Sequence, residues 1–143
     1  MISAQIAVLC LVIGISDGDT LKVRCGSPGQ YEEVKIRLAE VDAPEKAQPY
    51  GQRSKQSLSD LCYGKQAEIV VQGKSYDRRV AHVSCGGRDA GRTQVSRGMA
   101  WVSDKYAKDM SLYAVQAEAK AARRGLWADN NPIQPWEWRK KRR

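Results

Sequence analysis

Two short segments place acidic side chains near an arginine, a combination that suits metal binding and phosphate chemistry. The first segment is SDGDT at residues 16–20, and the second is IRLAEVDAPE at residues 36–45. In the second segment Arg37 precedes Asp42, and Glu45 follows it. Carboxylate oxygens are the hard ligands that calcium and magnesium prefer, and arginine can bind a phosphate through two parallel hydrogen bonds. For Arg37 with Asp42 alone, a salt-bridged strand end is the simpler interpretation.

The second segment has the pattern of a β-strand that ends at a proline. Apolar residues alternate with cations over residues 34–38, which places Arg37 on the face opposite the apolar side chains. Pro44 has no N–H to donate to a neighbouring strand. Asp42 and Glu45 therefore lie where the strand stops and their side chains are free for other contacts.

The first segment has the pattern of a tight hairpin turn. Asp17-Gly18 is a favoured pair for a two-residue turn, and residues 20–23 begin the return strand. A turn of this kind needs only one aspartate, so Asp19 is the surplus acid. Together with Asp42 it would supply two hard oxygen ligands for a divalent cation.

Five motifs in order resemble the staphylococcal nuclease (thermonuclease) family, and the similarity extends from about Leu11 to Trp127. The motifs are DGDT at 17–20, RLxxVDAPE at 37–45, YGQ at 50–52, YDR at 76–78 and RRGLW at 123–127. The resemblance implies an α+β protein, a five-stranded OB-fold β-barrel with about three flanking α-helices. It also implies a calcium-dependent phosphodiesterase that acts on DNA and RNA. Apolar spacing and end signals predict the helices near residues 52–62, 89–97 and 109–124.

The resemblance also implies a role for each residue of the two segments. Asp19, Asp42 and the main-chain carbonyl of Ala43 would bind Ca²⁺. Glu45 would orient or deprotonate the attacking water, and Arg37 would hold the phosphate and stabilise the charge that develops on it.

The third part of the implied site is contributed by the YDR motif and by a later tyrosine. Arg78 and Arg79 alternate faces on one strand, and the register of the family motif selects Arg78 as the second catalytic arginine. Tyr76 corresponds to the family's nucleoside-contacting tyrosine. A second family tyrosine falls at Asp104 by strict counting, and Tyr106 is the nearest substitute for it. Stacking and backbone contacts predict weak base preference.

The charge of the chain favours an acidic partner. Lysine and arginine number 24 against 16 acids, which gives a net charge of +8, and a basic surface attracts phosphate-rich polymers. We expect DNA and RNA as partners, preferably single-stranded or denatured, with no membrane association and a monomeric protein. The main alternative is a non-catalytic OB-fold nucleic-acid-binding module. Degenerate nuclease-like domains typically lose the acids and arginines that this chain retains.

The length of 143 residues fits one domain. We divide it into a nuclease-like domain over residues 1–129 and a basic C-terminal tail over 130–143 that contains Trp136 and Trp138. The basic run over 139–143 beside two indoles could grip nucleic acid. A flexible, solvated terminus is the interpretation that we favour for this tail.

The cysteines lack the spacing of a zinc site. They are Cys10, Cys25, Cys62 and Cys85. No C-x-x-C occurs and His82 is the only histidine. A regular turn at Asp17-Gly18 sets Cys10 opposite Cys25, but we favour a disulfide between Cys62 and Cys85. Four free thiols that pack as small buried hydrophobic side chains remain an open alternative.

The most apolar run covers residues 5–15. It has the length of a signal-peptide core, but no lysine or arginine precedes it and no small-residue cleavage site follows, so no complete signal peptide is present. It is also too short to span a bilayer. We predict that Leu9–Ile15 forms the buried first strand. The family resemblance favours an exported protein.

Overall fold

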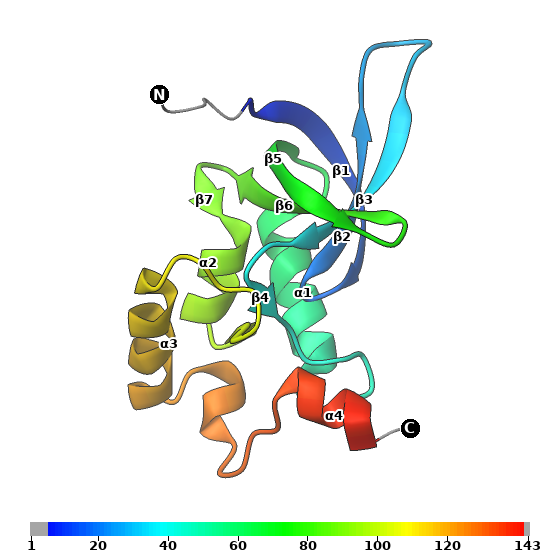
Figure 1. The fold of residues 1–143 in the computed structure, drawn as a ribbon. Helices are drawn as coiled ribbons and strands as arrows, with labels where there is room; N and C mark the ends of the chain where they lie inside the picture. The colour runs from blue at the N-terminus through cyan, green and yellow to red at the C-terminus, as the bar shows by residue number, and fades with distance from the viewer. Residues whose placement is uncertain (1–5, 142–143) are drawn as a thin grey trace.

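The computed structural model describes residues 6–141 and contains a closed β-barrel with helices packed beside it (Figure 1). The barrel strands are β1 (Val8–Asp17), β2 (Thr20–Cys25), β3 (Glu32–Leu38), β5 (Gln66–Ser75) and β6 (Arg78–Cys85). Neighbouring strands follow the order β3-β2-β1-β5-β6 in antiparallel pairs, and a parallel pairing of β3 with β6 closes the barrel. The predicted five-stranded OB-fold of the α+β class is confirmed.

Short elements connect the barrel to the helices. β4 (Val41–Asp42) pairs with β8 (Trp101–Val102), and β7 (Arg88–Asp89) pairs with the end of β6. The helices are α1 (Gly51–Cys62), α2 (Ala90–Ser96), α3 (Ser111–Ala121), the 3-10 helix η1 (Gly125–Ala128) and α4 (Pro135–Lys141). The three predicted helices correspond to α1, α2 and α3, and α4 is an additional helix in the C-terminal tail.

The core forms where the inner face of the barrel meets α1. Alternate residues of β2 and β3, including Leu21 and Ile36, are buried completely or nearly so, as period-2 patterning requires. Leu58 and Leu61 of α1 pack on them at helical spacing. Residues of β2 and β4 are part of this core, so the core positions Asp19, which precedes β2, and Asp42, which ends β4.

The β1–β2 hairpin differs from the predicted geometry. Asp17 pairs with Thr20, so the turn residues are Gly18 and Asp19 and not Asp17 and Gly18. A Cβ atom on Gly18 would lie 1.7 Å from the Ser54 hydroxyl oxygen and 2.9 Å from the Cβ of Ala43. The turn is therefore pressed against α1 and the end of β4, a position that only glycine allows.

All four cysteines form disulfides, Cys10 with Cys25 and Cys62 with Cys85. The first bridge joins β1 to β2. The predicted pairing of Ser16 with Asp19 is wrong. Register shifts between Val12 and Asp17 compensate for the displaced turn, so that Leu11 pairs with Arg24, the pairing expected next to Cys10 and Cys25. The second bridge joins the end of α1 to the end of β6.

The apolar N-terminal run forms β1, as predicted, but only one of its faces is buried. Cys10 and Val12 point into the core, whereas Leu9 is 63% exposed. Residue 5 of the run lies outside the described residues. Within residues 6–141, no helix has the length and apolar character needed to cross a membrane.

The prediction of a flexible, solvated tail is wrong for residues 130–141. Pro135 is buried, and the ring of Trp136 packs edge-on against Trp101 with centroids 6.0 Å apart. The side-chain amide of Gln48 donates a 2.6 Å hydrogen bond to the carbonyl of Ile133. Apolar and hydrogen-bonding contacts thus hold the tail on the domain. Arg142 and Arg143 of the basic run lie outside the described residues.

Replacing Cys62 and Cys85 together by alanine should lower the free energy of unfolding by about 3 kcal/mol, because the bridge closes a loop of 23 residues and restricts the unfolded chain. Urea unfolding of the variant and the parent under oxidising conditions measures the difference. The same comparison in reductant is the control. A difference that persists in reductant would assign the effect to lost packing and not to the bridge.

Candidate active site

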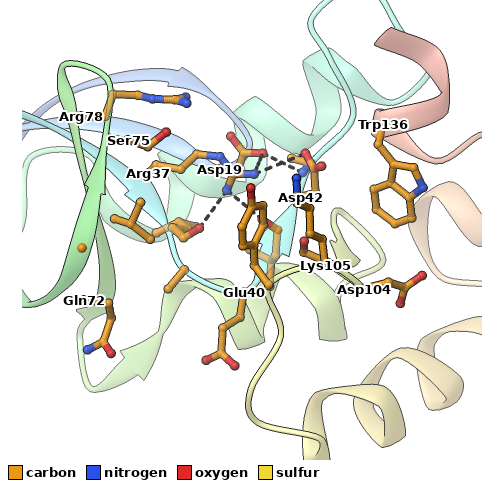
Figure 2. Close-up of a pocket in the computed structure, with 18 of the residues that line it drawn as sticks. Asp19, Arg37, Glu40, Asp42, Gln72, Ser75, Arg78, Asp104, Lys105 and Trp136 are labelled. Carbon is orange, nitrogen blue, oxygen red and sulfur yellow. Dashed lines mark hydrogen bonds and ion pairs between the residues drawn. The ribbon is translucent and has the colours of Figure 1, made fainter. Parts of the chain in front are cut away.

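The acids and arginines singled out in the sequence meet in a cleft of about 1330 Å³ beside the barrel. Its walls come from the β1–β2 turn, the β3–β4 region, the β5–β6 hairpin, the loop before α3 and helix α4. Figure 2 shows Asp19, Arg37 and Asp42 close together, with Arg78 on one side of them and Trp136 on the other. The two sequence segments therefore form one site.

Asp19 links the two segments through its carboxylate. Its Oδ2 accepts a 2.7 Å hydrogen bond from the N–H of Ala43, and its Oδ1 accepts a 2.9 Å hydrogen bond from the hydroxyl of Thr20. The side chain is almost fully buried. Asp42 is buried beside it, so the two expected carboxylate ligands are adjacent.

Arg37 is fixed between these two acids. Its Nη1 donates to the carbonyls of Leu38 and Val41 at 2.8 and 2.7 Å. Its Nη2 lies 3.4 Å from both Asp19 Oδ2 and Asp42 Oδ1. The two carbonyls and the two carboxylates therefore fix the orientation of the planar guanidinium.

Burial and charge act in opposite directions on the acids. Burial opposes the charge of Asp19, but Arg37 and the hydrogen bonds to the carboxylate outweigh it and hold the pKa of Asp19 below its ordinary value. Burial raises the pKa of the Asp42 carboxyl, although Arg139 and Arg37 oppose this shift. Asp19 is therefore the acid most firmly held as a carboxylate.

Asp17 is a residue of the site that the sequence interpretation missed. Its Oδ1 accepts a hydrogen bond of 3.2 Å from the N–H of Asp19, and its side chain lines the cleft. Burial and the neighbouring negative charge of Asp19 raise the pKa of Asp17 to about 7. The sequence interpretation placed Asp17 in the turn and gave it a purely structural role. In the structure the turn residues are Gly18 and Asp19, and the carboxyl of Asp17 points toward the backbone of Asp19.

Arg139 of α4 is the second residue that was missed. Its Nη2 lies 2.7 Å from Asp42 Oδ2, and its Nη1 lies 3.3 Å from Asp42 Oδ1 and 2.6 Å from Glu45 Oε1. One guanidinium therefore binds both acids at the end of the second segment. The only signal in the sequence was the basic tail, and nothing in its spacing indicated that one cation would reach the cleft.

Glu45 is held in a tight loop by its backbone. Its N–H donates to Gln48 Oε1 at 3.1 Å, and its carbonyl accepts from the N–H of Gln48 at 2.9 Å. A Cβ atom on Gly51 would lie 1.9 Å from the Glu45 carbonyl oxygen, so the start of α1 also presses on this loop. The Glu45 side chain is 37% exposed and lines the cleft.

The remaining predicted residues differ in whether they line the cleft and in how exposed they are. Arg78 lines the cleft, whereas the adjacent Arg79 is exposed outside the cleft lining. Tyr106 lines the cleft and is 64% exposed, with the ammonium of Lys105 5.3 Å from its ring centroid. Tyr76 is 90% exposed at the tip of the β5–β6 hairpin, outside the cleft lining.

Asp104, at the position where the resemblance places a tyrosine, also lines the cleft. Its carboxylate accepts a 2.5 Å hydrogen bond from the hydroxyl of Tyr113 on α3. The acid thus fixes the loop before α3, while Lys105 supplies a neighbouring cation.

The donor chemistry fits a hard divalent cation. Asp19 and Asp42 offer buried carboxylate oxygens, and the hydrogen bond from the Ala43 N–H to the Asp19 carboxylate brings the backbone of Ala43 to the same place. Within residues 6–141, no group of three or more His, Cys, Asp or Glu side chains forms a metal cluster. The expected set contains only two carboxylates, and the remaining ligands would be a main-chain carbonyl and water.

Comparison with known proteins identifies relatives over most of the chain. The staphylococcal nuclease homologue family matches residues 35–129. An uncharacterized endonuclease of Haemophilus influenzae is 46% identical over 132 residues, which are 92% of this chain and 72% of the relative. A micrococcal nuclease of Shigella flexneri is 36% identical and is covered to 79%, with 90% of this chain matched. A staphylococcal-like nuclease of Arabidopsis thaliana is 37% identical over 80% of this chain and 37% of its own length.

Asp17→Asn should flatten the pH dependence of stability in metal-free protein. The carboxyl titrates near 3.8 when unfolded and at about 7 when folded. Between these values only the folded state holds the proton, so the free energy of unfolding falls as pH rises. Asparagine keeps the oxygen that accepts from Asp19 and removes the titration. The variant should be more stable than the parent at about pH 8, by on the order of 1–3 kcal/mol.

Urea unfolding in chelator at about pH 4 and about pH 8 measures this effect. Asp60→Asn, at an exposed position on α1, is the matched control and should keep the pH dependence of the parent. Parallel stability profiles for Asp17→Asn and the parent would contradict the raised pKa.

Proposed function

The chain belongs to the staphylococcal nuclease family, and on that premise we propose that it is a calcium-dependent nuclease that hydrolyses phosphodiester bonds of DNA and RNA with little sequence preference. The observation that carries the proposal is the buried pair Asp19 and Asp42, with Arg37 at 3.4 Å from both. The net charge of +8 supports a polyanionic substrate.

The metal and the water would be bound beside the start of β2 and the end of β4. Calcium held by Asp19, Asp42 and the Ala43 carbonyl would neutralise phosphate charge and make water a better nucleophile. Glu45 would orient that water or accept its proton, a role that suits a partly exposed carboxylate in a loop fixed by Gln48.

The two arginines would act on the phosphate. Arg37 would donate hydrogen bonds to a phosphate oxygen from an orientation already fixed by the carbonyls of Leu38 and Val41. Arg78 would approach from the β5–β6 hairpin on the other side of the cleft. Both would stabilise the charge that builds up as the water attacks phosphorus.

The substrate chain would be bound mainly by stacking and by backbone contacts. Tyr76 and Tyr106 are largely exposed aromatic side chains on the hairpin and on the loop before α3. Exposed rings stack on unpaired bases, which favours single-stranded or denatured substrates. Lys105, beside Tyr106, adds a charge for the phosphate backbone.

We also propose that the protein is exported and monomeric. The two disulfides suit an oxidising compartment such as the periplasm or the extracellular medium. Both bridges lie within elements that carry the site, since β1 and β2 hold the Asp17–Asp19 turn and β6 holds Arg78.

Cleavage of denatured DNA and of RNA should require calcium, stop in chelator, and fall about 100-fold or more in Glu45→Gln, because general base catalysis is lost. Gel or fluorescence assays of the purified protein measure these rates. Glu33→Gln, an exposed acid on β3, is the control and should cleave like the parent. Binding of nucleic acid without cleavage in any divalent cation would instead support a non-catalytic OB-fold module.

Arg78→Lys should lower turnover by about 100-fold or more, because an ammonium cannot reproduce bidentate contact with the phosphate in the transition state. The neighbouring Arg79→Lys provides a matched control on the same strand and should retain the parent rate. Initial rates at saturating substrate measure the effect. Equal losses in both variants would show that the basic character of the strand, and not the position of Arg78, determines activity.

A further inference from the structure

Helix α4 brings a cation onto the acids that the proposed nuclease would use for metal and water. The guanidinium of Arg139 contacts both oxygens of Asp42, at 2.7 and 3.3 Å, and one oxygen of Glu45 at 2.6 Å. Asp42 is buried, while the side chain of Arg139 is 44% exposed. Arg139 therefore covers the acids from the solvent side.

A divalent cation and this guanidinium cannot bind Asp42 in the same arrangement. Calcium takes carboxylate oxygens at about 2.3–2.6 Å, and Arg37 already lies 3.4 Å from Asp42 Oδ1. Adding a doubly charged ion while Arg139 remains would place three cationic groups on one carboxylate. Like charges at this spacing repel strongly in a partly buried site. Binding of the ion therefore requires Arg139 to move away.

The short length of α4 makes such a movement feasible. The segment is anchored by the hydrogen bond from Gln48 to Ile133 and by the edge-on packing of Trp136 on Trp101. The helix itself is seven residues long, too short to be stable without these contacts. Loss of the Arg139 contacts would leave α4 held by its packing, which involves the buried Pro135 and the half-buried Trp136 and Trp138.

We propose that α4 is an autoinhibitory arm, in which Arg139 competes with the divalent cation for Asp42 and also occupies the Glu45 carboxylate that would act on the water. The proposal rests on the proposed function only in taking Asp42 as a metal ligand and Glu45 as the residue that acts on the water. Metal binding and arm docking are then linked in both directions, because each must weaken the other by the same factor. While α4 is docked, Arg139 occupies Asp42 and Glu45, and these acids become available only when a cation displaces it.

Calorimetric titration of Ca²⁺ into the full chain tests the competition. Arg139→Gln should bind Ca²⁺ roughly ten- to hundredfold more tightly than the parent, because the binding-competent state no longer needs the arm to leave. Lys141→Gln removes the same charge from the same helix at an exposed position outside the cleft lining, and its affinity should stay close to the parent's. Trp136→Ala, which loosens α4 without altering Arg139, should also tighten binding.

Hydrogen exchange followed by mass spectrometry gives the reciprocal readout. In the parent, Ca²⁺ should accelerate exchange in peptides that cover residues 130–141, and in Arg139→Gln these peptides should exchange fast before the ion is added. Equal Ca²⁺ affinity in Arg139→Gln and the parent, or weaker affinity in the variant, would overturn the competition. If calcium-dependent cleavage by the parent persisted in that case, the proposed function would stand. Absence of Ca²⁺ binding and of cleavage in every variant would overturn both.

Discussion

The hydrogen bond from the Ala43 N–H to Asp19 Oδ2 is the contact on which the site depends. It joins the tip of the β1–β2 hairpin to the end of β4, two places that lie far apart in the sequence. The join is possible because Gly18 has no side chain and lets the turn press against Ala43 and Ser54. Buried donors and acceptors must be paired, so this bond also fixes the orientation of the Asp19 carboxylate.

A second constraint is the excess of negative charge around this join. Arg37 and Arg139 contact Asp19, Asp42 and Glu45, and Asp17 adds a fourth acid beside Asp19, so the acids outnumber the two arginines. The protein accommodates the excess in two ways. Asp17 keeps its proton at pH values where an ordinary aspartate has lost it, because its pKa is raised. Arg139, from another part of the chain, places a positive charge on Asp42 and Glu45. A site in which a distant arginine must compensate the acidic charge has the electrostatic character that favours binding of a metal cation.

The fold and the centre of the site were predictable because they follow from local rules. Alternation identified the strand that carries Arg37, and the ordered motifs identified the barrel and the family. The prediction that this strand continues to Pro44 is wrong, because a turn at Ala39-Glu40, with φ of 70° at Glu40, ends β3 at Leu38 and separates it from β4. The role of Asp17 was missed because its contact depends on the strand register, and two bulges in β1 change that register without a clear signal in the sequence. Arg139 was missed because its contacts join residues more than 90 positions apart, and a run of cations does not reveal which member finds a partner.

The position of α4 beside the cleft makes the two ends of the chain unequal for protein engineering. The last described residues belong to α4, the helix that touches Asp42 and Glu45, whereas the start of β1 lies at the opposite end of the molecule (Figure 1). A purification tag or fusion partner attached behind α4 would start within reach of the acids, and a histidine or acidic tag there would itself bring metal ligands to the cleft. The same tag placed before β1 would lie away from Asp42 and Glu45 and would not bring metal ligands to them.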